Sequence, residues 1–241
     1  MKTPTIITAL TLALFVISCG SSNKTNQDRS ALTVETGFVQ IFDGRTFKGW
    51  ECDTAFWKIS DGVITGWETP EHQLKQNTFL IYTGGQPKDF ELKAEYRISE
   101  GGNSGIQYRS EKLPGLPYAL KGYQADIDGA NVYTGQNYEE RGRGFLAMRG
   151  QVADLPTNGK PLITGSVGDP DSLKARIRKN DWNEIHLVVK GFHMKHYING
   201  VLMSEAIDHD TANRRSGGLI GFQLHVAPAM TIEFRNIRLK E

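Results

Sequence analysis

Alternating apolar and polar residues predict three β-strands between residues 89 and 128. Residues 90–98, 106–109 and 123–128 each place apolar side chains at every second position. Because successive side chains of a strand point to opposite faces, one face should pack on a core and the other should be polar. The predicted polar face carries Glu95, Gln107, Arg109, Gln124 and Asp126. Such a set suits hydrogen bonds to a polyol, and a wet outer face with a salt bridge is the alternative.

Short strand patterns and turn signals continue along most of the chain. Strands are expected at 37–42, 56–59, 63–66, 79–83, 185–189, 193–198, 201–203, 217–226 and 230–239. Asn199-Gly200 is the strongest hairpin signal. Residues 131–148 form a long excursion with two short strands, and the irregular region 150–180 carries one helix signal at 169–173. The pattern predicts an all-β fold, an antiparallel sandwich of two sheets with little helix.

The strand expected at 217–226 repeats the division into two faces. Phe222 and Leu224 point one way, and Gln223 and His225 point the other. An amide and an imidazole therefore lie on the polar face of this strand, as the amides and carboxylate do on the strands at 106–109 and 123–128.

The N-terminus has the features of a lipoprotein signal peptide. After Lys2, residues 6–17 are apolar apart from Thr8 and Thr11, a run shorter than the roughly 20 residues that span a bilayer. The sequence VISC at 16–19 resembles a lipobox, so Cys19 is the predicted lipidation site. An ordinary secretory signal is the alternative.

This interpretation divides the chain into a signal peptide (1–18), a polar lipidated tether (19–36) and a β-sandwich domain (37–241). Gly20, rather than Asp, follows the cysteine, which resembles sorting to the outer membrane of a Gram-negative bacterium. The predicted location is the periplasm or the cell surface, with a lipid anchor as the sole membrane contact.

Charge and cysteine content narrow the classes of partner. The formal net charge of +1 gives no electrostatic footprint for nucleic acid and argues against a polybasic membrane patch. With Cys19 acylated, Cys52 has no partner for a disulfide and is expected to be a buried, inert thiol. Neither the net charge nor the cysteine content predicts an oligomeric state.

A series of short motifs resembles the 3-keto-disaccharide hydrolase family over residues 37 to 240. The motifs are FDG at 42–44, GW at 49–50, WKISDG at 57–62, FEL at 90–92, GNSGI at 102–106, GYQ at 122–124, WN at 182–183, ING at 198–200, GLIGFQLH at 218–225 and FRNI at 234–237. The resemblance implies a concanavalin A-like jelly roll with one concave sheet. It also implies cleavage of glycosides oxidised at sugar C3, by hydrolysis or by elimination followed by hydration.

This chemistry needs a base, a group that stabilises an oxyanion and a proton donor. A C3 ketone acidifies the C2 proton, and removal of that proton gives an enediolate that expels the C1 substituent. His225 is the first candidate for the base, Asp126 and Glu139 are the carboxylate candidates, and Arg109 would hold the oxyanion. A divalent ion chelating O2 and O3 is the candidate cofactor, with His225 and Asp126 as its candidate ligands.

Six further residues are expected to bind substrate. They are Asn103, Gln107, Gln124, Tyr138, Arg141 and Gln223. The partner implied by the resemblance is a carbohydrate, a 3-keto-glycoside. No Glu-x-Asp-x-x-Glu run is present, so the usual retaining pair of glucanases on this sandwich is not visible.

Each candidate residue also has a structural explanation. A lone histidine at a strand end is often structural, Asp126 can cap a turn, Arg109 can pair with Glu95, and Glu139 can lie in a solvated loop. His186, His193 and His196 lie near a predicted edge hairpin and are expected at the surface. At the level of function, a non-catalytic glycan-binding module and a structural surface lipoprotein are the alternatives to an enzyme.

Overall fold

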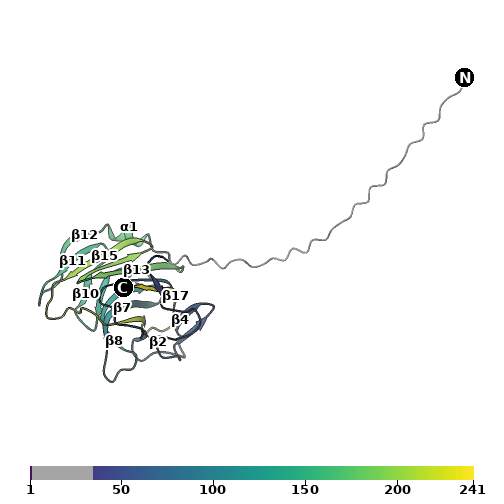
Figure 1. Cartoon of the computed structure of the whole chain (residues 1–241), viewed down its shortest axis with the longest axis horizontal. Coiled ribbons are helices and arrows are strands. Elements are labelled where there is room, and N and C mark those ends of the chain that lie inside the picture. The colour runs from purple at the N-terminus through teal and green to yellow at the C-terminus, as the bar shows by residue number, and fades with distance from the viewer. Residues whose placement is uncertain (2–34) are drawn as a thin grey trace. The chain divides into compact units, whose positions relative to one another are not determined.

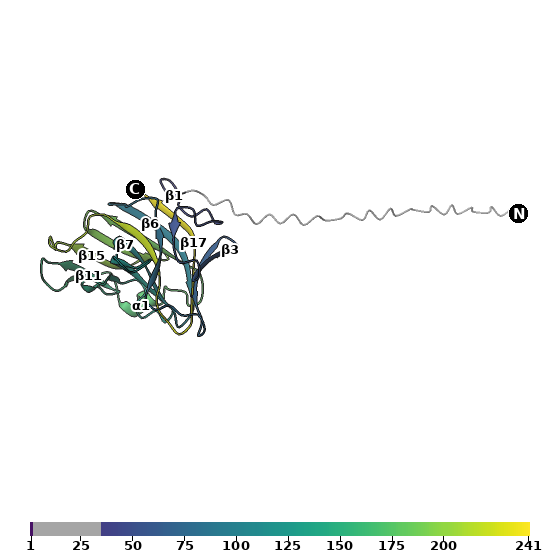
Figure 2. The ribbon, with the colours of Figure 1, turned by 90° about the horizontal axis from the view of Figure 1, so that it is seen from below.

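Two β-sheets pack face to face in the computed structural model, which describes Met1 and residues 35–241 (Figures 1 and 2). The predicted signal peptide, the lipidation site Cys19 and nearly all of the predicted tether lie outside the described residues. The two-sheet, all-β prediction is confirmed, and five residues form the one described α-helix.

The larger sheet has ten strands. Its order is β12-β11-β15-β14-β13-β6-β17-β4-β3, and β1 pairs with β17. The strands are β1 (Val39–Gln40), β3 (Trp57–Ser60), β4 (Val63–Glu68), β6 (Phe90–Ile98), β11 (Gln151–Leu155), β12 (Leu162–Ser166), β13 (Asn183–Lys190), β14 (His193–Ile198), β15 (Val201–Asp208) and β17 (Met230–Lys240). All neighbours in this sheet are antiparallel except β11 and β15, which are parallel.

The smaller sheet has seven strands in the order β10-β9-β8-β7-β16-β5-β2, all antiparallel. They are β2 (Trp50–Glu51), β5 (Thr78–Tyr82), β7 (Asn103–Lys112), β8 (Leu120–Asp128), β9 (Asn137–Glu140), β10 (Gly144–Ala147) and β16 (Leu219–Leu224). β9 and β10 are the two short strands expected within 131–148.

One predicted neighbour relation is wrong. The strand at 90–98 was expected beside 106–109, but β6 pairs with β13 and β17 in the ten-stranded sheet, whereas β7 and β8 belong to the seven-stranded sheet. Both strands direct their apolar faces inward, and the rings of Phe90 and Tyr108 meet across the interior at 5.9 Å between centroids. Glu95 therefore lies on the outer face of the opposite sheet, where it accepts a hydrogen bond from Arg235 at 2.7 Å.

The apolar faces of both sheets form one core. Trp57, Phe90, Tyr96 and Phe222 are all buried, as the alternation predicted. Phe222 of β16 meets Phe234 of β17 edge to face, with 4.8 Å between ring centroids, a favoured geometry for an aromatic pair. This contact joins the two sheets.

The region 150–180 contains more structure than its sequence indicates. The predicted helix is present as α1 (Pro170–Lys174), and the Asp169 carboxylate caps it by accepting the Ser172 N–H at 2.8 Å, as an N-cap residue does. The strands β11 and β12 were not predicted, because every residue of β12 is exposed and its sequence shows no apolar alternation. No helix among the described residues is long and apolar enough to cross a membrane.

Cys52 is half-buried rather than fully buried. Desolvation, with the nearby Asp53 and Glu51 carboxylates, raises the pKa of its thiol to about 12. The thiol is therefore protonated at neutral pH, which is the inert state expected for it.

Candidate active site

A cleft of about 240 Å³ opens on the face of the seven-stranded sheet that points away from the core. Its lining residues are Asn103, Gln124, Asp126, Tyr133, Tyr138, Glu140, Phe145, Gln223 and His225. Tyr123, Ala125 and Ile127 of the same strand β8 are buried in the interior, so the strand presents its alternate residues to the cleft.

Strand register brings residues that are distant in sequence together in the cleft. In β8, Gln124 lies opposite Gln107 of β7 on one side and Tyr138 of β9 on the other. Asp126 lies opposite Gly105. Side chains directly opposite one another on neighbouring strands stand about 5 Å apart, close enough for a single sugar ring to touch several of them.

Asp126 is a buried carboxyl in this cleft. It is 7% exposed; Gln124 Nε2 donates to its Oδ1 at 2.8 Å, and Gln136 Nε2 donates to its Oδ2 at 3.5 Å. Burial removes the carboxyl from water and raises its pKa to about 7, and the nearby Glu140 carboxylate adds to this rise. The two hydrogen bonds lower the pKa, but they do not cancel the effect of burial. Asp126 can therefore exchange a proton at neutral pH.

A chain of amides holds this carboxyl in place. The Ser110 hydroxyl donates to Gln107 Oε1 at 3.0 Å, and Gln107 Nε2 donates to Gln124 Oε1 at 3.2 Å. Gly105 leaves room for the Gln124 side chain, because a Cβ at Gly105 would lie 2.7 Å from Gln124 Cγ and Cδ. Gln107 is fully buried and supports Gln124 from behind rather than lining the cleft.

Gln223 presents an unpaired donor. Its side chain is fully buried, and its Oε1 accepts a weak hydrogen bond from Gln124 Nε2 at 3.5 Å. Its Nε2 has no protein partner within the described residues. A buried amide N–H without a partner is costly to leave unpaired, and Gln223 is one of the residues that line the cleft.

His225 lies directly after β16. Its Nδ1 is 2.8 Å from the Val226 carbonyl oxygen. Because a carbonyl oxygen only accepts, Nδ1 carries the hydrogen, and Nε2 of the neutral ring keeps its lone pair. Asn77 fixes the adjoining backbone, since its Oδ1 accepts the Val226 N–H at 3.1 Å. The imidazole is thus oriented as a proton acceptor at the cleft.

Glu140 is a cleft carboxylate that the sequence reasoning missed. It accepts a hydrogen bond from Asn77 Nδ2 at 3.2 Å, and Arg141 Nε lies 3.9 Å from its Oε1. Tyr138 and Glu140 are two residues apart on β9, so they share a face. Extending the alternation from Tyr138 would have selected Glu140 instead of Glu139.

Three aromatic side chains form the rim of the cleft. Phe145 lies 5.1 Å from Tyr138 and 6.0 Å from Tyr133 between ring centroids. Tyr133 and Phe145 are 40% and 46% exposed. Open aromatic faces of this kind offer apolar surface to the C–H face of a sugar ring.

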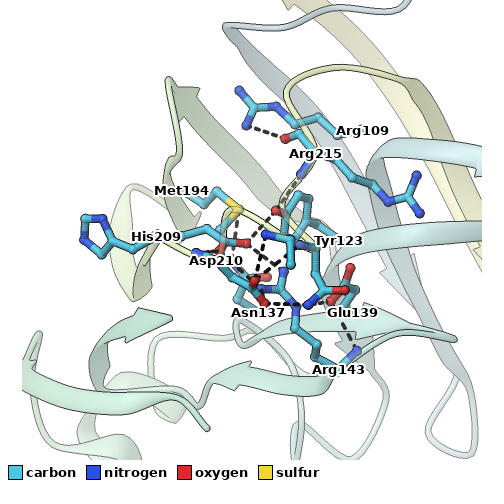
Figure 3. A network of polar contacts seen from close by, with 12 residues as sticks. Arg109, Tyr123, Asn137, Glu139, Arg143, Met194, His209, Asp210 and Arg215 are labelled. Atoms are coloured by element: carbon cyan, nitrogen blue, oxygen red, sulfur yellow. Dashed lines mark hydrogen bonds and ion pairs between the residues drawn. The ribbon is translucent and has the colours of Figure 1, made fainter. Parts of the chain in front are cut away.

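Glu139 does not line the cleft. It is 3% exposed and points to the opposite side of β9, where Arg143 Nε donates to its Oε2 at 2.5 Å (Figure 3). Arg143 also binds Asp208 at 2.6 Å and Asp210 at 3.3 Å, and the Tyr123 hydroxyl donates to Asp208. Burial alone would lower the pKa of Arg143, but the hydrogen bonds to Asp208 and Glu139 raise it.

This ionic network gives Glu139 a structural position. It joins β8 and β9 of the smaller sheet to β15 of the larger one, behind the strands that form the cleft. The placement of Glu139 at the site was therefore wrong, and so was its alternative placement in a solvated loop.

Arg109 is also absent from the cleft. Its guanidinium is buried and donates to the carbonyl oxygen of Lys88 at 2.5 Å. It also donates to the carbonyl oxygen of Arg215 at 3.0 Å (Figure 3). Its backbone has a positive φ of 49°, and the pairing of β7 with β8 shifts register between Tyr108 and Glu111. This bulge interrupts the alternation that had placed Arg109 with Gln107.

Two other expectations concern residues near the site. Arg141 is exposed in the turn after β9 and reaches the cleft only through Glu140.

His196 is fully buried, in contrast to the predicted surface position, and its Nε2 lies 2.9 Å from the Tyr108 hydroxyl. Burial lowers the pKa of His196 to about 4, so it is a neutral core residue.

The described residues hold no group of three or more His, Cys, Asp or Glu side chains arranged to bind a metal ion. His225 and Asp126, the candidate ligands, border the same cleft, and Glu140 lines it with them. A divalent ion at this cleft therefore stays a prediction.

The fold and the cleft together define a lectin-like or glucanase-like sandwich with a polar, carbohydrate-sized site. In fold it is similar to the carbohydrate-binding module CBM66 of Bacillus subtilis, with a TM-score of 0.52 and 17% identity, covering 80% of this chain and 96% of that one. It is also similar to a β-glucanase of Bacillus licheniformis, with a TM-score of 0.51 and 11% identity, covering 86% and 100%.

The sequence comparison is more specific. The family described as 3-keto-alpha-glucoside-1,2-lyase-like domain matches residues 37–240, and this chain belongs to that family. A protein of Bacteroides thetaiotaomicron named 3-keto-disaccharide hydrolase is 26% identical over 236 residues, which cover 85% of this chain and 78% of the relative. The resemblance seen in the sequence motifs is confirmed.

Proposed function

We propose that the cleft cleaves glycosides that carry a ketone at C3 of the sugar. The support is the family to which the chain belongs, together with a cleft that contains an imidazole and a carboxyl able to exchange protons. In this reaction the C2–H bond and the C1–O bond break, and a C1=C2 double bond forms. The products are an unsaturated keto sugar and an alcohol, and water adding at C1 then completes net hydrolysis.

His225 and Asp126 take the two proton-transfer roles. His225 Nε2 has the free lone pair and accepts the C2 proton. Asp126 in its protonated form donates to the departing glycosidic oxygen. The single observation that carries this assignment is the pKa of Asp126, which burial raises to about 7, because a general acid works best with a pKa near the working pH.

Gln223 replaces Arg109 as the group that stabilises the oxyanion. Removal of the C2 proton puts negative charge on O3, and the donor assigned to it is Nε2 of Gln223, a cleft residue whose amide nitrogen has no partner among the described residues. Such preorganised donors typically contribute about 10²–10³-fold to rate. Asn103, Gln124 and Glu140 line the same cleft and are placed to bind the remaining hydroxyls.

The test is incubation with methyl 3-keto-glucoside in D₂O. We expect release of methanol and deuterium at C2 of the sugar that re-forms, since the proton removed there exchanges with solvent. Activity should fall as pH rises through about 7, because Asp126 loses the proton that it donates. Asp126→Asn should lower kcat by about 10²–10⁴-fold, whereas Asp171→Asn, at an exposed position on α1, should not change it.

A glycan-binding module is the second candidate, favoured by the similarity of the fold to CBM66 and by the exposed aromatic rim. It predicts that the sugar binds and is recovered intact, with no deuterium at C2. That result would rule out the enzyme.

We also propose that the protein is a lipoprotein of the cell envelope, anchored through Cys19. The support is the lipobox-like sequence VISC at 16–19 and the polar stretch after it. A keto-glycoside would then be cleaved outside the cytoplasm.

A further inference from the structure

A second cavity borders the cleft. It measures about 440 Å³, within the range of small-molecule sites. It lies among the loop before β9, the residues after β10, and the segment from β12 to α1. None of the residues assigned to the reaction lines it.

The two cavities share a wall. Gln136 lines the second cavity, and its Nε2 donates to Asp126 Oδ2 at 3.5 Å in the first. The consecutive residues Val132 and Tyr133 line the second and the first cavity respectively. The Gln136 side chain, which is 1% exposed, therefore stands between Asp126 and the second cavity.

The shared wall is fixed in place by Asp128. Its carboxylate accepts the backbone N–H groups of Val132 at 2.9 Å, Tyr133 at 2.8 Å and Thr134 at 2.8 Å. The Thr134 hydroxyl in turn donates to Asp128 Oδ1 at 3.0 Å. Three backbone bonds to one buried carboxylate hold the loop in one conformation, so both cavities are preformed.

The lining of the second cavity contains three apolar side chains that are open to water, beside the polar residues Gln136, Gln151 and Ser166. Val132, Met148 and Ile163 line it and are 51%, 39% and 53% exposed. These three residues form a group of exposed apolar side chains next to the cleft. Such groups are typical of binding surfaces.

Among the described residues that line this cavity, no charged side chain is without a hydrogen-bond partner. The sole charged lining residue is Arg149, and its guanidinium donates to Thr134 O at 2.8 Å and Pro170 O at 3.1 Å. It is thereby committed to the backbone. A ligand with a carboxylate or phosphate would find no unengaged cation, so the cavity suits an uncharged group.

We propose that this cavity is the leaving-group subsite and that it takes an apolar, uncharged alcohol rather than a second sugar. The inference rests on the proposed function. With the keto sugar in the cleft, the C1 oxygen lies at Asp126, and the carbon skeleton attached to it passes Gln136 into the second cavity. The preferred substrates are then 3-keto-glycosides of hydrophobic alcohols.

Three substrates test this inference: methyl and cyclohexylmethyl 3-keto-glucosides, whose leaving alcohols have similar acidity, and a disaccharide 3-keto-glucoside. We expect kcat/KM for the cyclohexylmethyl glycoside to exceed that for the methyl glycoside by roughly 10–100-fold, since a buried hydrocarbon ring is worth at least that in an apolar site. The disaccharide should be no better than the methyl glycoside, because its second ring offers hydroxyls rather than hydrocarbon to Val132, Met148 and Ile163.

A matched pair of variants on β12 locates the effect. Ile163→Asp places a charge in the cavity and should reduce the ratio of cyclohexylmethyl to methyl kcat/KM at least tenfold. Leu162→Asp is the control, because Leu162 is 57% exposed and does not line the cavity; it should leave the ratio unchanged.

The outcomes are distinct. Turnover of the methyl glycoside with a ratio near one, a preference for the disaccharide, or an equal effect of both variants would overturn the subsite while sparing the proposed function. Failure to cleave any of the three would overturn the proposed function and the subsite with it.

Discussion

Replacing Asp126 by Asn should change how the stability of the protein depends on pH. In the unfolded chain the carboxyl has its ordinary pKa of 3.8, and burial raises the pKa to about 7 in the folded protein. Between these values the folded protein keeps a proton that the unfolded chain releases. The free energy of unfolding contributed by Asp126 therefore falls as pH rises from about 4 to about 7. Asparagine does not titrate, so the variant lacks this contribution.

The magnitude follows from the difference between the two pKa values. At about 1.4 kcal/mol for each tenfold change in proton affinity, the shift from 3.8 to about 7 corresponds to at most about 4 kcal/mol. The asparagine amide faces the donors of Gln124 and Gln136. An unmatched donor costs about 1–3 kcal/mol, and this cost is the same at every pH.

Urea unfolding followed by tryptophan fluorescence measures the effect. We expect the stability of Asp126→Asn minus that of the wild type to rise by about 3–4 kcal/mol between pH 4 and pH 8. The exposed control Asp171→Asn should give a difference that is flat to about 0.5 kcal/mol. A flat difference for Asp126→Asn would show that the carboxyl titrates alike in both states and would remove the basis for its role as the acid.

Four further predictions can be checked separately. His225→Ala should reduce turnover of methyl 3-keto-glucoside by about 10²–10⁴-fold with little change in melting temperature, because a base is lost from a half-exposed position; unchanged turnover would refute the assignment. Arg143→Met should cost about 3–5 kcal/mol in urea unfolding, since it leaves buried carboxylates uncompensated, and a loss below 1 kcal/mol would contradict the network. Gly105→Ala should displace Gln124 and raise KM several-fold, visible as weaker sugar binding by calorimetry, with Gly101→Ala as the unhindered control. Cys19→Ser should prevent labelling with a radioactive fatty acid and release the protein from the membrane fraction, whereas a mature N-terminus other than Cys19 would refute lipidation.

Alternation along single strands predicted the face on which each site residue lies. Gln124, Asp126, Gln223 and His225 all border one cleft, because pleating turns alternate residues to the same side whatever the neighbouring strand is. Burial of Trp57 and the other aromatic core residues follows from the same rule.

Alternation could not predict which strands are neighbours. The segment 90–98 has the same pattern whether it pairs with β7 or faces it across the core, so Glu95 was placed in the wrong sheet. Arg109 was misplaced by a bulge, since a positive φ in a non-glycine residue leaves no mark in the polar pattern. His196 was taken for a surface residue, because the pairing of its imidazole with the Tyr108 hydroxyl, 88 positions away, is invisible in the sequence.

The second cavity was beyond sequence reasoning for a different reason. Its walls come from the segments around residues 132, 148 and 163, none of which shows a regular pattern. The exposed strand β12 looks like a loop in sequence, yet Ile163 on this strand contributes to the cavity. Contacts between irregular segments depend on the whole packed structure, so the leaving-group subsite could only come from the folded chain.

The unpaired amide of Gln223 lowers the stability of the folded protein but serves its proposed activity. An apolar side chain of similar size, such as methionine, would remove the buried donor that has no partner, so Gln223→Met should make the ligand-free protein harder to unfold. The same change would remove the donor assigned to the oxyanion. Selection for heat resistance alone would therefore favour losing this glutamine, and a library screened only for thermal survival should accumulate well-folded, inactive proteins altered at residue 223.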